Sequence, residues 1–214
     1  MKKKILIFAA GPAGREVFQL VSSINKLKNE WEIIGYVDDD PIKVGTTVDG
    51  VQVYSNKNKP VKREMYATCG LMNHKIRKKI FNEEIIKSGY QITNLIHPLI
   101  EKPKCFKIGN GNIVFGNIHI SFEVTIKNFS IISNFCDLAH NLITYDYVTI
   151  MPSAIIGGNC EIGENTLIGA GARIHQGTKI GKNCKIGMGT LILNNVKNNT
   201  AVVDFPRKVQ NENK

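Results

Sequence analysis

An aliphatic residue recurs at every sixth position from Ile108 to Ile192, and Thr144 is the one exception among these fifteen positions. Neither an α-helix, with a period of 3.6 residues, nor a flat strand, with a period of 2, explains a strict period of six residues. The pattern predicts a parallel β-helix of hexapeptide repeats, in which short strands wind into stacked coils. A second register of small residues precedes the later aliphatics by two positions, as a narrow prism requires at its inward sites. These residues are Ala154, Cys160, Thr166, Ala172, Thr178, Cys184 and Thr190.

Glycine follows the aliphatic residue in the clearest repeats. These glycines are Gly157, Gly163, Gly169, Gly181 and Gly187. We expect them to adopt corner dihedrals that other residues resist. The repeat is least regular where Thr144 replaces the aliphatic and Tyr145 the glycine, so we expect a relaxed coil at 141–147.

The first half of the chain follows a different pattern, in which strands alternate with helices. We expect strands at 3–8 and 31–37, one ending near Cys69, and a last one at 92–96. We expect one helix from Arg15 through Ile24, separated from the first strand by a turn at 9–14, and a second helix over 73–87. Such alternation predicts a parallel sheet, and the change of period near Pro98 divides the chain into domains 1–96 and 97–214.

The formal net charge is +10, from 28 Lys and Arg against 18 Asp and Glu in 214 residues. This charge suits a phosphorylated ligand, although solvated lysines account for it equally. No basic stripe with interleaved aromatics occurs, so nucleic acid is not an expected partner. With no long apolar run and no cleavable signal, we expect a cytoplasmic protein without membrane insertion. Cys136, Cys160 and Cys184 fall in the small register as core thiols, and no Cys/His spacing predicts a metal site.

The turn after the first strand contains Gly11 and Gly14, an incomplete form of the glycine-rich nucleotide fingerprint. At a helix N-terminus, backbone N–H groups and the helix dipole favour a phosphate. Asp38 and Asp39 follow the second strand and are placed to accept hydrogen bonds from a ribose or base. These features are also compatible with a NAD-dependent oxidoreductase, but no set of catalytic residues supports that alternative. The alternative is a tight turn followed by solvated aspartates.

In combination, the two halves resemble the bacterial sugar acyltransferases, which join a Rossmann-like half-domain to a left-handed β-helix. Within these the chain is similar to the family of sialic acid O-acetyltransferases and of bacillosamine and perosamine N-acetyltransferases. The carriers of the resemblance are Ala9–Glu16, Tyr36–Asp39, Ile76–Lys79, Asn94–Pro98, Ala139–His140, Ser153–Asn159 and Val203–Lys208.

The resemblance implies a homotrimer with acetyl-CoA in the groove between neighbouring coils and a nucleotide sugar held mainly by the N-terminal domain. His140 matches the catalytic histidine, and Gly158 matches a glycine whose N–H stabilises the thioester oxyanion. The implied nucleotide-sugar residues are Gly11, Pro12, Ala13, Gly14, Asp38, Asp39 and Asn73. The implied acetyl-CoA residues are Gly158, Ala170, Gly171, Lys185, Met188, Pro206 and Arg207.

These roles suit the chemistry of acyl transfer. A histidine titrates near neutrality and takes the proton of an attacking amine or hydroxyl, and two residues beyond the inward Leu138 we expect His140 to face outward. One N–H donor at Gly158 would stabilise the transition state by roughly 3 kcal/mol. The alternative is that Gly158 is simply a turn glycine.

Asn141 departs from the family, which places an acid directly after the histidine. An amide orients the ring but adds no charge. Three explanations stay open: Asp137 or Asp146 replaces the missing acid, His140 is a weaker base acting on an easier substrate, or the enzyme has reduced or lost activity. The other histidines are weaker candidates. His97 is expected to be structural, and His74 either caps a helix or contacts the nucleotide. His119 and His175 fall in other hexapeptide frames than His140, which argues against a metal site formed by three histidines.

We therefore expect an acetyl-CoA-dependent transferase that acetylates the amino group of a UDP-, GDP- or dTDP-linked amino-deoxy sugar for surface-glycan synthesis. Two alternatives stay open: O-acetylation of sialic acid or a related sugar, and a catalytically silent nucleotide-sugar-binding protein. The irregular coil near Thr144 is expected to shape the acceptor pocket.

Overall fold

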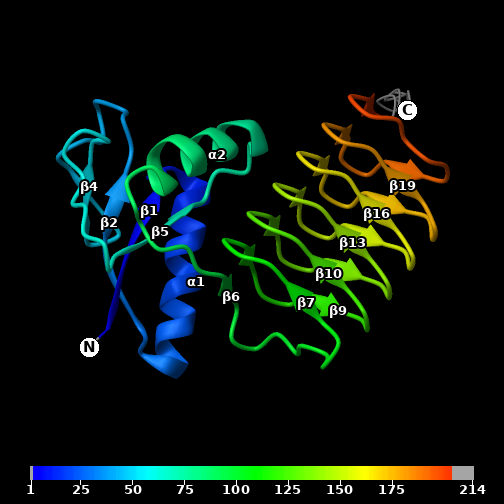
Figure 1. Cartoon of the computed structure of the whole chain (residues 1–214), viewed down its shortest axis with the longest axis horizontal. Helices are drawn as coiled ribbons and strands as arrows, with labels where there is room; N and C mark the ends of the chain where they lie inside the picture. Colours follow the sequence, from blue (N-terminus) through cyan, green and yellow to red (C-terminus); the bar gives the residue numbers. More distant parts are fainter. Residues whose placement is uncertain (1, 204–214) are drawn as a thin grey trace, which may run out of the picture.

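A computed structural model describes residues 2–203, in which an α/β region is followed by a solenoid of stacked coils (Figure 1). The elements of the α/β region are β1 (Lys3–Phe8), α1 (Pro12–Lys28), β2 (Trp31–Val37), β3 (Thr47–Val48), β4 (Val51–Tyr54), β5 (Tyr66–Cys69), α2 (His74–Ile80) and the π-helical turn η1 (Phe81–Ile86). The three strands predicted before residue 70 and both helices are thus confirmed.

The α/β region is a five-stranded sheet in the order β3-β4-β2-β1-β5, parallel except for the β3–β4 hairpin. Strand β1, which lies between β2 and β5, is hydrophobic because both faces of the sheet are covered, and Ile5, Leu6 and Ile7 are fully buried. Helix α1 lies between the sheet and the solenoid (Figure 1). Its inward face, including Val17 and Val21, packs in one cluster with Ile131 of the solenoid. The sheet and the solenoid therefore share a core.

Two details of this region differ from the expectation. Helix α1 begins at Pro12, not at Arg15, because proline favours the first helical turn, where its missing N–H is not needed. The β3–β4 hairpin was not predicted, although its turn residues Asp49 and Gly50, at φ of 48° and 80°, form the Asp-Gly pair that favours tight hairpins.

The expected strand at 92–96 is shorter and belongs to another sheet. Only β6 (Leu95–Ile96) is a strand, and it pairs in parallel with β8 (Ile113–Val114) of the solenoid. Its side chain at Leu95 is buried against α1 and the first coil. The division into domains 1–96 and 97–214 stays a prediction.

The solenoid consists of two-residue strands that form three parallel sheets. Strands that pair are 18 residues apart, except for β20 and β22, which are 16 residues apart. The β7 face comprises β7 (Lys107–Ile108), β10 (Thr125–Ile126), β13 (Ile143–Thr144), β16 (Glu161–Ile162) and β19 (Lys179–Ile180). The β8 face comprises β6, β8, β11 (Ile131–Ile132), β14 (Thr149–Ile150), β17 (Leu167–Ile168), β20 (Lys185–Ile186) and β22 (Ala201–Val202). The β9 face comprises β9 (His119–Ile120), β12 (Asp137–Leu138), β15 (Ile155–Ile156), β18 (Arg173–Ile174) and β21 (Leu191–Ile192). The predicted fold, a parallel α/β region followed by a hexapeptide β-helix, is confirmed.

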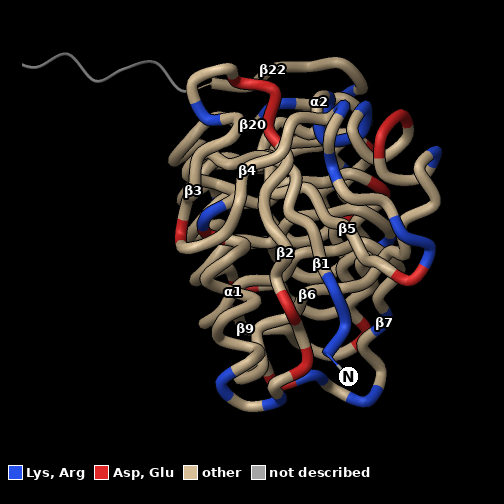
Figure 2. The backbone as a smooth tube through the Cα atoms, turned by 90° about the vertical axis from the view of Figure 1, so that its left-hand side faces the viewer, with Lys and Arg blue, Asp and Glu red and all other residues tan. Residues whose placement is uncertain are grey.

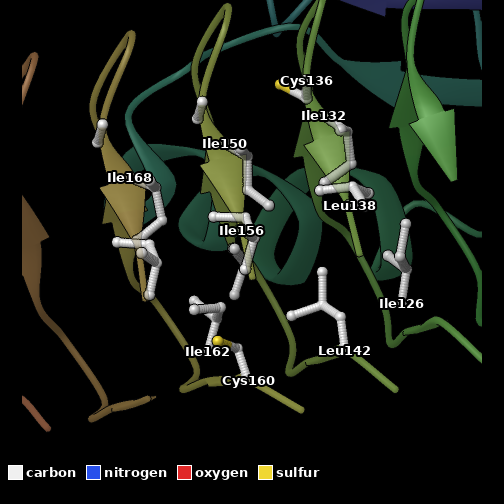
Figure 3. Packing of buried hydrophobic residues seen from close by; sticks show 14 of the residues in the cluster. Ile126, Ile132, Cys136, Leu138, Leu142, Ile150, Ile156, Cys160, Ile162 and Ile168 are labelled. Atoms are coloured by element: carbon white, nitrogen blue, oxygen red, sulfur yellow. The ribbon is translucent and has the colours of Figure 1, made fainter. Parts of the chain in front are cut away.

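Both inward registers are also confirmed. The aliphatic residues from Val114 to Ile192 are buried, and the small residues two positions earlier are buried beside them. Figure 3 shows this column, with Cys136 and Cys160 among the isoleucines and leucines of the core. The three cysteines of the register are buried free thiols, as predicted.

The glycines after the aliphatic residues have a different role from the one expected. None of the five is among the residues with positive φ. A Cβ atom at Gly169 would instead lie 2.6 Å from backbone atoms of the next coil, and Gly157 and Gly163 are equally close to theirs. The left-handed corner positions lie two residues further on, at Asn141, Asn159 and Asn165 among others. Glycine is therefore needed at these positions for the close stacking of coils and not for its dihedrals, whereas at Gly187 the nearest atom is further away, at 3.1 Å.

The prediction of a relaxed coil near Thr144 is wrong. Strand β13 pairs in register with β10 and β16, and Tyr147 has the same left-handed φ as the corner residues of its neighbours. The Thr144 side chain is fully buried, and its Oγ1 has no hydrogen-bond partner among the described residues. Threonine has the shape of valine, so it occupies the inward position without disturbing the coil.

Candidate functional site

The three faces of the prism meet at three edges. The chain passes from the β9 face to the β7 face through residues 139–142 and their equivalents, and we call this the histidine edge. It passes from the β7 face to the β8 face through 145–148 and their equivalents, the α2 edge, and from the β8 face to the β9 face through 169–172 and their equivalents, the third edge. These names locate each candidate residue below.

His140 lies on the histidine edge, outside the core, as expected. Its ring stacks on Phe122 of the preceding coil, with ring centres 5.2 Å apart and an angle of 8° between the planes. Its Nδ1 lies 2.9 Å from Oδ1 of Asn141. Because an amide oxygen only accepts, this contact places a proton on Nδ1, and in the uncharged tautomer the lone pair is then on Nε2. Nε2 is the atom of a histidine that acts as a base in this arrangement.

Gly158 lies in the next coil, directly against this ring. A Cβ atom at Gly158 would overlap with Nε2 and Cε1 of His140, so any other residue at position 158 would displace the imidazole from this position. The Gly158 carbonyl accepts a hydrogen bond from the Gly177 N–H at 2.8 Å. Its own N–H has no acceptor among the described residues. Phe122, His140 and Gly158 thus form a column along the histidine edge, one residue per coil.

The acid near His140 is neither of those considered from the sequence. Asp137 Oδ1 lies 2.8 Å from Nδ1 of His119, and Asp146 accepts hydrogen bonds from Asn128. The carboxylate that contacts Asn141 belongs to Glu123 of the preceding coil, whose Oε2 accepts from Asn141 Nδ2 at 2.6 Å. The coil length of 18 residues, applied to position 141, would have identified Glu123 and likewise Phe122.

A cavity of about 390 Å³ lies where β1 and β2 end, between these strand ends and α2. The carboxyl ends of parallel strands are where ligands bind in open α/β sheets. Its lining residues are Phe8, Ala9, Val37, Asp38, Asp39, Asn56, Leu71, Ile76, Lys79, Ile80, Glu83 and Glu84. The structure therefore brings Asp38 and Asp39 into one cavity but leaves Gly11–Gly14 and Asn73 outside its lining.

The two aspartates also hold backbone around the cavity. Asp38 accepts from the Ala10 N–H at 2.9 Å, and Asp39 accepts from the Asn56 N–H at 2.7 Å. Ala9 has φ of 84°, a left-handed conformation that is uncommon outside glycine and clusters at functional sites. Gly14 packs so close to the Ala9 carbonyl that a side chain would not fit. These contacts give the turn after β1 one defined shape.

The remaining nucleotide-sugar candidates lie at helix starts. Gly11 is the N-cap of α1, and Pro12, Ala13 and Gly14 form its first turn. Asn73 is the N-cap of α2, where its side chain accepts from the Lys75 and Ile76 N–H groups at 3.1 and 3.2 Å. These hydrogen bonds explain why asparagine stands at position 73.

The acetyl-CoA candidates are divided between edges. Gly158 is on the histidine edge, whereas Ala170, Gly171 and Met188 are on the third edge. Lys185 begins β20 on the β8 face. Pro206 and Arg207 lie outside the described residues. One chain alone therefore does not bring the third-edge residues to His140.

Arg77 joins α2 to the solenoid. It is 1% exposed, and burial lowers its pKa to about 10. Nε donates to the Phe129 carbonyl at 3.1 Å, and Nη2 donates to the Thr149 hydroxyl at 2.8 Å. Further bonds reach the carbonyls of Leu71, Met72, Tyr147 and Val148. The α/β region is thereby attached at the α2 edge and the β8 face, away from the histidine edge.

The other histidines lie apart from His140. His97 packs against Gly116 at the junction of the two regions, and burial lowers the pKa of His74 at the start of α2. His119 is on the β9 face and His175 on the histidine edge. Within residues 2–203, no three His, Cys, Asp or Glu side chains are grouped to hold a metal ion.

Figure 2 shows Lys and Arg spread over loops and element ends, interspersed with Asp and Glu and not gathered in one stripe. Of the helices in the described part of the chain, none combines the length and the hydropathy of a membrane span. The charge excess is thus distributed over this face of the molecule.

Two family models match the chain. The PglD N-terminal domain matches residues 4–83, and the hexapeptide repeat of succinyl-transferase matches residues 161–194. No curated protein sequence matches it. The first match covers the α/β region with the cavity, and the second covers the coils that follow Gly158.

Solved structures resemble the chain over nearly its whole length. The acetyltransferase domain of PglB from Neisseria gonorrhoeae is 25% identical, with a TM-score of 0.83 over 94% of this chain and 97% of that one. WeeI from Acinetobacter baumannii is 25% identical, with a TM-score of 0.69 over 95% and 97%. PerB from Caulobacter crescentus is 20% identical and shares the fold, with a TM-score of 0.81 over 97% of each chain.

The order of the two domains, the outward histidine on the coil edge and the likeness to these proteins agree with one another. The chain is an acyltransferase with a PglD-type N-terminal domain and hexapeptide repeats, and its architecture is similar to that of the bacterial sugar acyltransferases.

Proposed function

We propose that the chain transfers an acetyl group from acetyl-CoA to the amino group of a nucleotide-linked amino-deoxy sugar during surface-glycan synthesis. The observation that carries this proposal is the position of His140, whose Nδ1 is bonded to Asn141 while Nε2 faces Gly158. The PglB domain has been solved in complex with acetyl coenzyme A, and PerB in complex with CoA and GDP-perosamine. These two ligands belong to the two substrate classes that the proposal assigns to this chain.

The reaction requires one proton transfer and one exchange of bonds. The sugar amine attacks the thioester carbonyl carbon, forming a C–N bond, while Nε2 of His140 takes a proton from the nitrogen. Collapse of the tetrahedral intermediate breaks the C–S bond, and the proton on His140 passes to the departing thiolate. The products are an acetamido sugar and CoA, and the histidine returns to its neutral form.

Gly158 is proposed to stabilise the oxyanion of that intermediate. Its N–H has no acceptor among the described residues and lies next to the ring that receives the proton. A preorganised donor of this kind is worth roughly 3 kcal/mol of transition-state stabilisation. The roles of His140 as base and Gly158 as donor therefore need the two residues in contact, as they are here.

The nucleotide part of the acceptor is proposed to bind in the cavity at the ends of β1 and β2. Among the described residues Asp39 accepts only through Oδ1, so its Oδ2 can accept from a ribose or base beside the apolar side chains of Phe8 and Ile76. Both oxygens of Asp38 already accept from the Ala10 and Asp40 N–H groups, so its part is to shape the cavity. The first turn of α1, at Gly11–Gly14, offers N–H groups and the positive end of a helix dipole to the phosphates.

We also propose a homotrimer, in which sites form between chains. In one chain the α/β region lies on the α2 edge and the β8 face, whereas His140 is on the histidine edge. Large apolar side chains are exposed on the histidine edge and the β9 face, including Phe122, Leu191 and Leu193. Apposing the histidine edge to the third edge of a neighbour covers them and brings Ala170, Gly171 and Met188 toward His140.

The proposal is tested by mixing the full chain with acetyl-CoA and a panel of UDP-, GDP- and dTDP-linked amino-deoxy sugars, and following thiol release and acetamide formation. We expect release with at least one amino sugar, and none with its hydroxyl counterpart or with free sialic acid. Transfer to a hydroxyl group would show an O-acetyltransferase. Tight nucleotide-sugar binding without thiol release would show a silent binding protein. Light scattering should give three times the chain mass of 23.8 kDa.

A further inference from the structure

We propose that Glu123 is the carboxylate that supports His140 as a base, acting through the side-chain amide of Asn141. Glu123 is then a positioning residue, since it reaches the ring only through Asn141. This inference rests on the proposed function, because it assigns the group that completes the base of the same site. It names a residue one coil away from the position that directly follows the histidine.

Three side chains from two coils form a continuous hydrogen-bonded row. Nδ1 of His140 lies 2.9 Å from Oδ1 of Asn141, and Nδ2 of Asn141 lies 2.6 Å from Oε2 of Glu123. The amide can donate only through nitrogen and accept only through oxygen, so the row has one direction: the ring donates to the amide, and the amide donates to the carboxylate. This direction places the Nδ1 proton and leaves Nε2 free for the substrate.

The row also lets the negative charge of Glu123 stabilise a positive charge on the His140 ring. A hydrogen bond to a carboxylate polarises the amide, which makes its oxygen a stronger acceptor for the Nδ1–H group. When Nε2 takes the proton of the substrate, the new positive charge is stabilised by the Glu123 carboxylate through the amide. In this chain the amide and the acid therefore share the task of supporting the base.

The coil geometry explains how Glu123 comes to this place. Glu123 and Asn141 are 18 residues apart and both occupy the left-handed corner of their coils, at φ of 56° and 57°. Asparagine tolerates this conformation better than most residues. Side chains at the same corner of successive coils stack, so a long glutamate reaches the amide above it.

Few other groups act on the row. Among the described residues Glu123 forms no ion pair with Lys or Arg. The Cys105 sulfur accepts from the Glu123 N–H at 3.1 Å and is the other titratable group in contact. The ring itself touches Phe122 and Gly158, which carry no charge. Within residues 2–203, Glu123 is thus the one charged side chain that is bonded to Asn141 or His140.

The test compares the wild-type chain with Glu123→Gln, which keeps an acceptor for the amide but removes the charge. Asp146→Asn is the matched control, because Asp146 makes the same kind of carboxylate–amide contact with Asn128 across 18 residues on the α2 edge. Two quantities are measured: kcat with KM for both substrates over pH, and titration of the His140 imidazole by 15N NMR in the full chain.

For Glu123→Gln we expect kcat to fall about tenfold at neutral pH while both KM values stay within twofold. The His140 ring should release its proton at a lower pH than in the wild type, because the imidazolium has lost its counter-charge. The acidic limb of the rate–pH profile should move in the same direction. Asp146→Asn should change none of these quantities.

A second variant exchanges the two groups. Asn141→Asp combined with Glu123→Gln places the carboxylate directly on Nδ1 and the amide behind it, and should recover at least half of the wild-type kcat and the wild-type titration of His140. Unchanged titration and kcat in Glu123→Gln would overturn the inference, as would an equal loss in Asp146→Asn. A chain that transfers no acetyl group but shows the Glu123-dependent titration would contradict the proposed function and support the row.

Discussion

The imidazole of His140 lies against the backbone of Gly158 so closely that a methyl group at position 158 would occupy the space of Nε2. The pair comes from adjacent coils, 18 residues apart along the chain, and the missing side chain of one makes room for the ring of the other. Gly158 is not in a left-handed conformation, so steric contact with His140 and not its dihedrals requires glycine there.

Replacing Gly158 by Ala should therefore push the ring out of place. We expect kcat to fall on the order of a hundredfold, as small displacements of a catalytic group do. The free energy of unfolding should fall by about 1 to 2 kcal/mol, because the added methyl group overpacks the site. Introducing Gly158→Ala into a His140→Ala background gives the control, since the loss of stability should vanish when the ring is absent. An equal loss of stability in both backgrounds would refute the contact.

Arg77 should be essential for holding α2 on the solenoid. Arg77→Met leaves several buried carbonyls without a donor, and we expect a loss of about 3 kcal/mol or more in the free energy of unfolding. Arg77→Lys should recover little, because an ammonium group lacks the planar fork that reaches these carbonyls. Lys75→Met on the exposed side of α2 is the control and should change stability by less than about 0.5 kcal/mol. Urea denaturation of the three variants measures this.

Asp49 should make stability depend on pH. The hydrogen bonds from Arg15 hold the pKa of Asp49 below its usual value, and the bond from Tyr36 acts in the same direction. A carboxyl whose pKa is lower in the folded state stabilises above the unfolded value of about 3.9, and this contribution is lost as pH falls through the folded value. Asp49→Asn keeps the turn, since asparagine also accepts a left-handed φ.

For Asp49→Asn we expect a loss of about 1 to 2 kcal/mol at pH 7, a modest value because Arg15 is exposed. The difference from the wild type should shrink steadily below about pH 4. Chemical denaturation at a series of pH values measures it. Glu32→Gln, at an exposed position of β2, should show no such convergence, and a difference that persists in acid would contradict the assignment.

Ile76 tests the cavity at the ends of β1 and β2. Ile76→Glu introduces negative charge into a cavity that already holds Asp38 and Glu83, so it should repel the phosphates of a nucleotide sugar. We expect KM for the sugar to rise tenfold or more while KM for acetyl-CoA stays within twofold. Ile42→Glu replaces another exposed isoleucine, one outside the cavity lining, and should leave both KM values unchanged. A parallel rise in both variants would place the nucleotide elsewhere.

Local pattern predicted much of the fold. The period of six identified the solenoid, its inward residues and the outward direction of His140, because each inward side chain must fit the same narrow prism. The strands before residue 70 followed from their apolar runs. The pattern misassigned residues 92–96, since a short apolar run does not reveal which sheet it joins, and β6 joins the solenoid.

The partners of each candidate residue depended on stacking between coils. The sequence suggested Asp137 and Asp146 because they are near His140 along the chain, but the structure gives one to His119 and the other to Asn128. Glu123 lies further away in sequence and one coil away in space. The corner glycines were interpreted from dihedral preference, whereas their neighbours in the next coil decide their role.

The sequence by itself determined the repeat, the order of the two regions and the residue types able to perform acyl transfer, because periodicity and composition are local properties. Only the tertiary structure decided which residues meet: Gly158 under His140, Glu123 behind Asn141, and Arg77 between α2 and the solenoid. Those contacts join positions separated by a whole coil or more. They depend on how coils stack and how α2 packs, which no single stretch of sequence records.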